Sequence, residues 1–444
     1  MKIKLPQQVA YIIGKLEEHG YEAYAVGGCV RDSILGRIPD DWDITTSAKP
    51  KQVKAVFGRT IDTGIQHGTV TVMLEKCGYE VTTYRIDGEY EDSRHPKEVI
   101  FTNNLVEDLK RRDFTINAMA YSPKAGLIDV FDGMGDIKRK IIRCVGTATE
   151  RFGEDALRIL RAVRFGAQLK FQIEEETREA IRICARSLEN ISAERIQTEL
   201  VKLMVSPEPE RLKEAYELGI TKVILPELDA CFACEQENIH HCYNVGEHIM
   251  KALTYIPNGK VERLAILFHD IGKPEKKNVD EQGQAHFYNH AARSKDMTDT
   301  IMRRLKFDND TRMKVMKLVE LHDERPSLKR KSVKKLMVKT GTELFLPLLE
   351  VKRADTYAQS EYEREEKLSY IERLEEVYYD ILEKEECISL KELALDGNDL
   401  QSLGVPRGKQ IGEILQELFE MVLENPDRNT KEYLTEEVRK RIHI

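Results

Sequence analysis

The sequence predicts an α+β fold in which a small mixed β-sheet near the N-terminus is followed by helices through the rest of the chain. Two observations carry this prediction. Residues 23–46 contain a short apolar run, a Gly-Gly pair, a helix-like piece and a second strand, and alternating strands are predicted at 64–74 and 78–85. From residue 154 onward, apolar residues recur at the three- and four-residue spacing of helices. A chain of 444 residues is expected to hold roughly three domains.

Composition excludes several classes of protein. The net charge of −8 argues against a protein that coats DNA, although a local basic patch still binds nucleic acid. No apolar run is long enough to span a membrane, and residues 1–10 lack a signal sequence, so we expect a cytoplasmic protein. The eight cysteines follow no regular framework, which suits reduced thiols, and one CxxC pair at Cys231 and Cys234 is a poor zinc signature.

Two carboxylates begin the second predicted strand. Asp41 and Asp43 lie on either side of Trp42, and the strand is expected to run over 42–46. Because side chains alternate between the faces of a strand, the residues on either side of Trp42 point the same way. Mg²⁺ prefers one or two carboxylates together with substrate phosphates, so this pair predicts a Mg²⁺ site.

A glycine turn precedes these carboxylates. Gly27 and Gly28 follow the apolar run and open a predicted helix over 29–35, which contains Arg31. Glycines let backbone N–H groups approach phosphate oxygens, and a helix start adds favourable partial charge. The turn and the carboxylates together predict a site for Mg²⁺ and a polyphosphate.

A third carboxylate is predicted on the strand that ends near residue 85. Thr71, Met73 and Val81 fit the buried side of a half-buried sheet, while Glu80 occupies the opposite face. Glu80 is therefore a candidate third active-site carboxylate, and an exposed strand glutamate is an equally open interpretation.

Two adjacent arginines, Arg111 and Arg112, precede Asp113. Asp113 is predicted to cap a helix that runs through Met119, which would place both arginines beside an anion-friendly helix start. An arginine fork binds phosphate in a more directional way than a lysine does.

A strong helix is predicted over 154–169. Asp155, Arg158, Arg161 and Arg164 follow one another at three-residue spacing along it. The plain interpretation is an intrahelical Asp–Arg pair. The functional interpretation is base recognition, since an aspartate accepts from an exocyclic amine and an arginine donates to a ring nitrogen or carbonyl. Cytosine and adenine share that edge, so one such pair would accept CTP and ATP and reject UTP and GTP.

Histidines gather in the third quarter of the chain. Seven of the eleven lie between residues 240 and 322, and several sit in or at the end of apolar helical runs. Histidine and carboxylate together suit a divalent metal that activates water. A structural role stays open for His240, His241 and His286. The candidate ligands are His248, His269, Asp270, His290, His322 and Asp355.

The last stretch is charged and helical. Leu368, Ile371, Leu374 and Val377 form one apolar stripe. A later turn brings Lys409 to a helix start, which fits either a contact with a phosphate backbone or ordinary packing.

Several motifs resemble those of a known family. GGCVRD at 27–32, DWDITT at 41–46, RRDFTINA at 111–118 and EDxxR at 154–158 resemble the nucleotidyltransferase superfamily, in the branch of tRNA CCA-adding enzymes and bacterial poly(A) polymerases. HDIGKP at 269–274 resembles the HD phosphohydrolases, including those fused to CCA-adding enzymes. The resemblance covers nearly the whole chain.

The resemblance implies four domains and their roles. It implies a catalytic nucleotidyltransferase head at 1–145, a helical neck at 146–225, an HD domain at 226–365 and a tRNA-binding tail at 366–444. A polar loop between Arg85 and Phe101 resembles the mobile loop that helps the family switch from C to A.

The resemblance also implies an activity. The 3′-hydroxyl of tRNA would attack CTP twice and ATP once, releasing pyrophosphate, with Mg²⁺ ions held by Asp41 and Asp43. The residues implied to hold the nucleotide are Gly27, Gly28, Arg31, Arg112, Asp155, Arg158, Arg161 and Arg164. The HD domain would hold a divalent metal of unidentified kind, with Lys273 placed to contact phosphate.

Three other interpretations stay open. The same head would serve an enzyme that adds only A, or a bacterial poly(A) polymerase. A different class is an HD metal phosphohydrolase whose head merely binds RNA. The oligomeric state and the substrate of the HD domain are unknown from the sequence.

Overall fold

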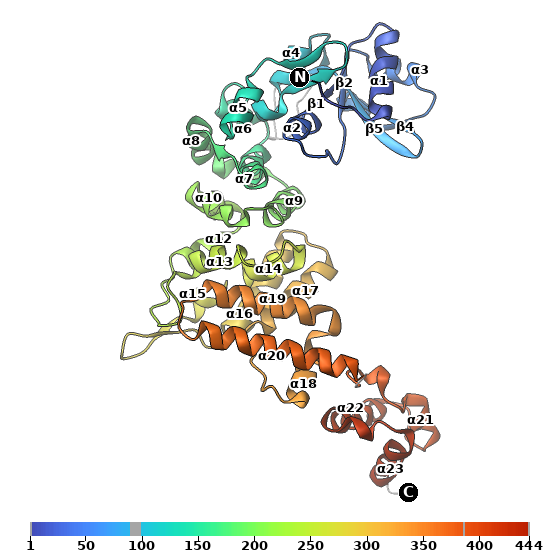
Figure 1. Cartoon of the computed structure of the whole chain (residues 1–444), viewed down its shortest axis with the longest axis vertical. Coiled ribbons are helices and arrows are strands. Elements are labelled where there is room, and N and C mark those ends of the chain that lie inside the picture. The colour runs from blue at the N-terminus through green and yellow to red at the C-terminus, as the bar shows by residue number, and fades with distance from the viewer. Residues whose placement is uncertain (1, 89–98, 385–386, 443–444) are drawn as a thin grey trace. The chain divides into compact units, whose positions relative to one another are not determined.

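The computed structural model describes residues 2–88, 99–384 and 387–442. The chain divides into two compact units, Met1–Asp229 and Ala230–Ile444, coloured blue to green and green to red in Figure 1. This division lies close to the boundary predicted between 225 and 226. The predicted domain boundaries stay predictions.

A seven-stranded mixed sheet forms the core of the first unit (Figure 1). Its strand order is β3-β4-β5-β2-β1-β8-β9; β2 and β5 are parallel, and the other neighbouring strands of this sheet are antiparallel. The prediction of a small mixed sheet is confirmed. The strands are β1 (Ala23–Val26), β2 (Ile44–Thr46), β3 (Thr60–Gly64), β4 (Thr69–Leu74), β5 (Cys77–Thr83), β8 (Met119–Ser122) and β9 (Gly126–Asp129).

Two details of the predicted strands are wrong. The second strand begins at Ile44 and not at Trp42, so Asp41 and Asp43 lie just before it. Thr71 is the cross-strand partner of Glu80 and therefore shares its face, whereas Val70 pairs with Val81 on the buried side. β-branched residues suit both faces of a strand, so the alternation alone did not show which face was buried.

Short elements frame this sheet. The predicted mobile loop begins as β6 (Arg85–Asp87) and ends as β7 (Val99–Phe101), which pair antiparallel; its residues 89–98 lie outside the described part of the chain. The other elements of the first unit are α1 (Gln7–Glu18), α2 (Gly28–Ile34), α3 (Pro50–Val56), η1 (Ile65–His67), α4 (Leu105–Lys110), η2 (Thr115–Asn117), α5 (Gly133–Arg139), β10 (Ile141–Ile142), α6 (Ala148–Glu154), α7 (Leu157–Leu169), β11 (Gln172–Ile173), α8 (Glu175–Cys184), η3 (Ala185–Asn190), α9 (Ala193–Met204), η4 (Pro209–Arg211), α10 (Leu212–Glu217) and α11 (Thr221–Ile224).

The helix predicted to start at Asp113 does not form. A single 3₁₀ turn, η2, leads directly into β8, which pairs with the central strand β1 through Ala25 and Tyr121. All four residues of β8 are buried. Pairing with β1 satisfies the backbone of this buried segment, so the tertiary context overrides a local capping signal.

The helix predicted over 154–169 begins three residues later. α6 ends at Glu154, Asp155 has an extended backbone, and α7 starts at Leu157. The Asp155 Oδ1 atom accepts a hydrogen bond from Leu157 N at 3.1 Å, so its side chain satisfies one of the free N–H groups at the start of α7.

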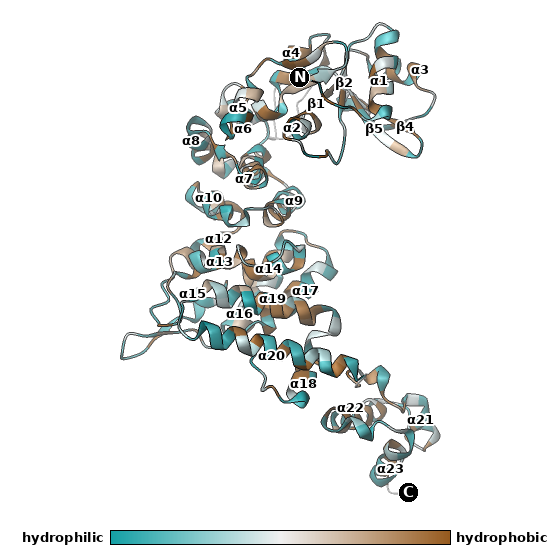
Figure 2. Cartoon of the chain, in the orientation of Figure 1, coloured by the Kyte–Doolittle hydropathy of each residue, from teal (hydrophilic) through white to brown (hydrophobic). Residues whose placement is uncertain are grey.

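The second unit is almost entirely helical (Figure 1). α20 shows how its surface helices are built: Ile371, Leu374, Tyr378 and Ile381 are buried, and Figure 2 shows hydrophilic residues over much of the rest of the helix. No described helix is long and apolar enough to cross a membrane. α12 (Pro226–Phe232) spans the division, and the second unit continues with α13 (Val245–Leu253), α14 (Lys260–Phe268), α15 (Lys273–Lys276), β12 (Asn278–Val279), β13 (Ala285–His286), α16 (His290–Arg304), α17 (Asn309–Leu321), α18 (Arg330–Thr340), α19 (Thr342–Ala358), α20 (Arg364–Glu383), η5 (Leu390–Glu392), α21 (Gly397–Ser402), α22 (Lys409–Glu424), η6 (Pro426–Arg428) and α23 (Lys431–Ile442).

Replacing Gly27 with alanine is expected to destabilise the first unit. Gly27 has φ 84° and ψ −132°, and a Cβ there would lie 2.9 Å from Arg112 Nη1. The strained backbone costs about 1–3 kcal/mol. Urea unfolding followed by the fluorescence of Trp42, the only tryptophan of the chain, measures the change.

Gly14→Ala is the matched control for Gly27→Ala. Gly14 lies inside α1, and a Cβ there meets nothing within 4 Å, so this change is expected to leave stability equal or raise it by about 0.4–1 kcal/mol. An unchanged unfolding midpoint for Gly27→Ala would contradict the requirement for glycine.

Candidate active sites

The parallel pairing of β2 and β5 places two carboxylates side by side. Ile44 pairs with Val81 in this register, so one residue earlier Asp43 stands next to Glu80 and on the same face. The Asp43 carbonyl accepts a hydrogen bond from Val26 N at 3.0 Å, which ties the carboxylate segment to the end of β1. The structure thus brings the third predicted carboxylate to the first two.

The charges at this site interact strongly. Loss of hydration raises the pKa of Asp43, the negative charges of Asp41 and Glu80 raise it further, and Arg112 opposes them. Asp43 is solvent-exposed as a whole residue, but its carboxyl is surrounded by enough protein to lose hydration. Three carboxylates and one arginine therefore share one electrostatic site, as Mg²⁺ and a triphosphate require.

The carboxylates of the first unit are more widely spaced than ligands around a bound ion. Among the described residues, the groups whose ligand atoms all lie within 4.8 Å of one another occur only in the second unit. Asp41, Asp43 and Glu80 would have to draw together around a cation.

Arg112 reaches this site because Gly27 has no side chain. Its guanidinium packs against the Gly27 backbone, and its Nη2 atom lies 3.6 Å from Asp108 Oδ2. Burial lowers the pKa of Arg112, while Asp108 and Asp43 oppose that change. The buried Nε atom has no hydrogen-bond partner. A buried N–H group without an acceptor is suited to donate to an anionic ligand.

Arg31, predicted to contact the triphosphate, is engaged within the protein. Its guanidinium donates to both oxygens of Asp32, at 2.9 and 2.7 Å, and to Asn117 Oδ1 at 2.7 Å. These bonds connect α2 to η2, next to Gly28. Arg31 therefore stabilises the turn in this structure.

The intrahelical Asp155–Arg158 pair of the plain interpretation does not form. Asp155 Oδ2 accepts instead from Arg195 Nη2 at 2.7 Å, and Arg158 donates to Glu154 Oε2 at 2.6 Å and to the Arg111 carbonyl. The intrahelical spacing fails because Asp155 precedes α7. Arg195, on α9, is the partner that sequence reasoning missed, since only a contact between distant segments reveals it.

The two remaining arginines of α7 are also paired. Arg161 binds Asp113 at 2.7 Å, and although burial opposes ionisation, Arg161 and Asn117 lower the pKa of Asp113 to about 2. Arg164 and Glu199 form a buried ion pair. Arg164 is therefore structural in this state, whereas Arg161 remains partly exposed beside the site.

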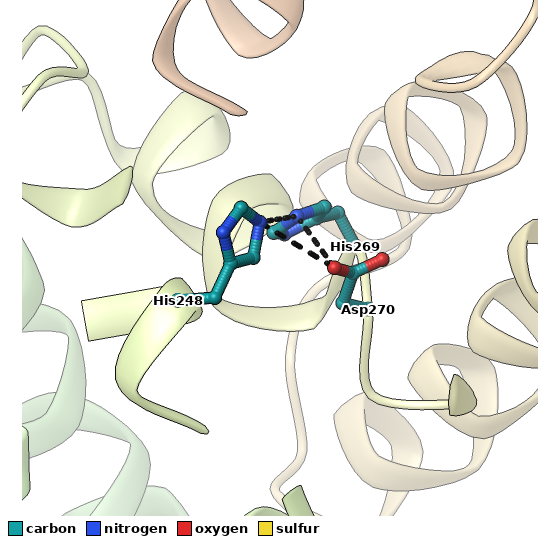
Figure 3. Close-up of side chains that lie close together, drawn as sticks. All are labelled: His248, His269 and Asp270. Atoms are coloured by element: carbon teal, nitrogen blue, oxygen red, sulfur yellow. Dashed lines mark hydrogen bonds and ion pairs between the residues drawn. The ribbon is translucent and has the colours of Figure 1, made fainter. Parts of the chain in front are cut away.

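The second unit gathers all six predicted ligands. His248 Nε2 lies 3.3 Å from His269 Nε2 and 3.0 Å from Asp355 Oδ1, and Figure 3 shows His248, His269 and Asp270 pointing toward one another. On the other side of Asp270, His290 Nε2 lies 3.2 Å from His322 Nε2. Two groups of possible metal ligands result, and Asp270 belongs to both.

Backbone carbonyls orient the four imidazoles. The Nδ1 atoms of His269, His290 and His322 lie 2.7–2.9 Å from the carbonyls of Ile266, Phe287 and Val319, and His248 Nδ1 lies 3.3 Å from Ala358 O. A carbonyl only accepts, so each Nδ1 donates its hydrogen. The four Nε2 atoms therefore converge, which is the arrangement that metal-binding histidines adopt.

Asp270 lies at the centre of this cluster, 1% exposed. Neither carboxylate oxygen makes a hydrogen bond of regular geometry, although Lys273 Nζ approaches Oδ2 to 2.8 Å. Burial opposes protonation of His269, but Asp270 and Asp355 outweigh it and raise the pKa of His269 to about 10. Protonated His269 thus supplies positive charge beside the two carboxylates. Histidine nitrogens and carboxylate oxygens together are ligands that suit divalent metal ions.

A cavity of about 670 Å³ opens onto the cluster. Asp270, His290, His322 and Asp355 line it, together with Lys273. The cluster is therefore accessible to a small substrate, which a purely structural metal site would not need.

Comparison with known proteins identifies the family. The poly A polymerase head domain matches residues 23–143, the RNA and SrmB-binding site of polymerase A matches 170–232, and domain 2 of tRNA nucleotidyltransferase matches 278–438. The CCA-adding enzyme of Lactobacillus johnsonii is 34% identical over 428 residues, covering 96% of this chain and 95% of that enzyme. The chain belongs to the CCA-adding enzyme family.

Two further relatives define the extent of the similarity. The CCA-adding enzyme of Lactobacillus delbrueckii subsp. bulgaricus is 56% identical over 196 residues, which cover 44% of this chain and 50% of that enzyme; the chain thus spans about half the length of that relative. The crystal structure of the Bacillus stearothermophilus CCA-adding enzyme in complex with CTP is 30% identical, with a TM-score of 0.72, and the match covers 99% of this chain and 98% of that one. The α+β fold of the family therefore extends over the chain.

Asp43→Asn is expected to stabilise the first unit when no divalent metal is present. A carboxyl whose pKa is raised by folding costs stability above its folded pKa, and the cost disappears as pH falls below the unfolded value. The unfolding midpoint should therefore rise at about pH 7 and change little near about pH 4. Urea unfolding in EDTA measures this.

Asp40→Asn is the control for this substitution, because Asp40 is a neighbouring exposed carboxylate. If the unfolding midpoint rises equally in both variants, the cause is the change in the net charge of the protein and not the local repulsion at Asp43. A lower midpoint for Asp43→Asn at neutral pH would contradict the prediction.

Proposed function

We propose that the chain adds C, C and A to the 3′ end of tRNA without a nucleic-acid template, using CTP and ATP. The observation that carries this proposal is the convergence of Asp41, Asp43 and Glu80 with Arg112 at one end of the sheet, in a chain of the CCA-adding enzyme family. The intact carboxylate set argues against a head that merely binds RNA.

The chemistry follows from these groups. The 3′-oxygen of the RNA forms a bond to the α-phosphorus, the bond to the bridging oxygen breaks, and pyrophosphate leaves while the hydroxyl proton passes to solvent. Mg²⁺ held by Asp41 and Asp43 would lower the pKa of the hydroxyl and neutralise the triphosphate. Arg112, whose Nε lacks a partner, holds the triphosphate beside the glycine turn.

Base selection is assigned to Asp155 and Arg158. Arg195 and Glu154 hold these two side chains in place, so each presents its remaining hydrogen-bonding atoms in a fixed orientation. Rigid donors and acceptors discriminate well, since a wrong base leaves them unpaired.

Each part of the chain has a proposed role. Nucleotide addition is assigned to residues 1–145 and 146–225, and contact with tRNA to residues 366–444. The cytoplasm is the proposed location of the protein. Addition of A alone, or of a poly(A) tail, is the alternative for the same head. Primer extension separates these activities when it is run on three tRNA substrates, which end before CCA, after the first C and after the second C. Addition of CCA that then stops supports the proposal. Extension only from the substrate that ends in CC, or an untemplated A tail, contradicts it.

Asp41→Ala is expected to lower nucleotide addition by about 100-fold or more, because a ligand for the catalytic cation is lost. Binding of tRNA, measured by filter retention, should stay close to that of the original protein. Asp40→Ala, one residue away, is the control and should keep its activity. Retained addition by Asp41→Ala would remove the metal-binding role.

A second activity is supported by the cluster in the second unit. We propose that this site, at 226–365, hydrolyses a phosphate ester or anhydride with a divalent metal held by the four histidines, Asp270 and Asp355. The observation that favours it is the convergence of four Nε2 atoms on two carboxylates beside an open cavity. Bound metal would supply an activated water.

Asp270→Ala is expected to remove the bound metal of the second unit and to lower hydrolysis of p-nitrophenyl phosphate by about 100-fold or more, since Asp270 belongs to both ligand groups. Elemental analysis of the desalted protein measures the metal. Asp310→Ala, an exposed carboxylate on α17, is the control. Metal content unchanged by Asp270→Ala would contradict the assignment, and CCA addition should be unaffected in both variants.

A further inference from the structure

A second, smaller cavity meets the larger one at the metal cluster. It has a volume of about 250 Å³ and extends toward Tyr370 and Ile371 on α20. Both cavities are lined by His322 and Asp355, so each reaches the same ligands from its own side. The residues shared by the two are His322, Asp323, Arg325, Asp355 and Lys367.

Two cations without carboxylate partners stand where the cavities meet. Arg325 is exposed and makes no hydrogen bond or ion pair with the described residues. Lys367 donates to Gln359 Oε1 at 3.0 Å, and no described carboxylate lies within ion-pair distance of it. Burial lowers the pKa of Lys367, and the charge of Arg325 lowers it further, while Glu363 and Asp355 oppose the change. Two adjacent cations, neither in an ion pair with a described carboxylate, form a site for an anion.

Two of the residues shared by the cavities are acids, Asp323 and Asp355, and Asp355 is a candidate metal ligand. In the larger cavity, Glu320 is paired with Lys295 and Glu324 with Lys339. Glu363 and Glu366 line the smaller cavity alone and place negative charge around its wall. An anion is therefore favoured at the junction beside Arg325 and Lys367, and not deep in the smaller cavity.

An aromatic surface lies at another part of the larger cavity. Tyr288 is 71% exposed, and its ring stacks on His286 with centroids 5.5 Å apart and planes at 6°. His286 is held by Asp280, 2.8 Å from its Nε2 atom. Both aromatic residues line the larger cavity and neither lines the smaller one. An exposed, supported ring of this kind stacks on a nucleobase.

We propose that the substrate of the second site is a nucleotide that carries at least two phosphates. Its base stacks on Tyr288, the phosphate nearest the ribose lies at the metal ligands, and the next phosphate binds Arg325 and Lys367. This inference rests on the proposed phosphohydrolase function. A simple monoester would leave the cationic pair unused, and inorganic pyrophosphate would leave the aromatic surface unused.

The reaction follows from this placement. The oxygen of water bonds to the phosphorus nearest the ribose, and the bond from that phosphorus to the bridging oxygen breaks. The proton of the water passes to the departing phosphate. The products are a nucleoside monophosphate and either phosphate, from a diphosphate, or pyrophosphate, from a triphosphate, and no oxidant or reductant is needed.

Binding of non-hydrolysable guanosine ligands to the full chain tests the proposal. Guanosine is chosen because the proposed base selector of the first unit rejects it. Isothermal titration calorimetry compares a guanosine monophosphonate with guanosine 5′-(α,β-methylene)diphosphate. Arg325→Met is expected to weaken the diphosphate ligand by about tenfold and to leave the monophosphonate unchanged, because only the second phosphate reaches Arg325.

Arg373→Met is the matched control, since Arg373 is an exposed arginine of α20 that lines neither cavity. The proposal would be overturned if Arg325→Met and Arg373→Met changed the affinity for the diphosphate ligand equally. It would also be overturned if Arg325→Met weakened the binding of both ligands by the same factor. Circular dichroism of each variant shows that the helices are kept.

Tyr288→Ala tests the nucleoside part. It is expected to weaken both guanosine ligands by a similar factor and to leave methylenediphosphonate, which has no ring, unchanged. If methylenediphosphonate binds as tightly as the guanosine diphosphate analogue and Tyr288→Ala changes neither, the site takes inorganic pyrophosphate and the nucleotide proposal is overturned.

Hydrolysis of p-nitrophenyl phosphate separates this inference from the function on which it rests. Hydrolysis that persists while Arg325→Met fails to discriminate the ligands overturns the inference alone. Absent hydrolysis with the expected discrimination overturns the phosphohydrolase function and supports the binding geometry.

Discussion

Both candidate sites depend on carboxylates that the fold holds close to other polar groups against an electrostatic cost. In the first unit, β-sheet pairing places Asp43 beside Glu80, and the resulting repulsion raises the pKa of Asp43. In the second, helix packing buries Asp270 among imidazoles. Arg112 offsets part of the charge in the first unit, and His269 and Lys273 do so in the second. A divalent cation would supply the remainder, so the arrangement makes physical sense as a metal-dependent enzyme.

The two sites are prepared for a cation in different ways. The imidazoles of the second unit are oriented in advance, because each Nδ1 donates to a backbone carbonyl and Nε2 faces the cluster. The carboxylates of the first unit are exposed and more widely spaced, and they have no comparable support. Mg²⁺ typically binds through a few carboxylates and the substrate phosphates. The first site therefore depends on the nucleotide to complete it, whereas the second has most of its ligands in place.

Arginines around α7 illustrate how a binding site is kept rigid. Arg158, Arg161 and Arg164 each bind a different carboxylate, and Asp155 is held by Arg195 from α9. Apart from Arg158 and Glu154, which are four residues apart, these pairs come from segments far apart in the chain. A network of this kind fixes the position of each polar group, and it leaves only a few donors and acceptors for a ligand.

Much of this protein could be predicted from local sequence. The strand at 23–26, the helix after Gly27 and the hairpin at 69–83 follow from apolar patterning and glycine positions. The six candidate ligands of the second unit were singled out because histidines and aspartates are rare at the ends of apolar helical runs. Residue type there indicates chemistry directly, since few other roles require a buried His-Asp pair.

Tertiary structure decided what local patterns left open. The segment after Asp113 carries a capping signal, yet it becomes β8 because it pairs with β1. Arg195 was missed as the partner of Asp155, because a salt bridge between distant segments leaves no periodic trace in the sequence. The meeting of the two cavities at Arg325 and Lys367 likewise depends on three helices and a turn brought together by folding. The sequence determined which chemical groups are present and in which local elements, and only long-range packing determined which of them face one another, because contact energies between distant segments outweigh local preference.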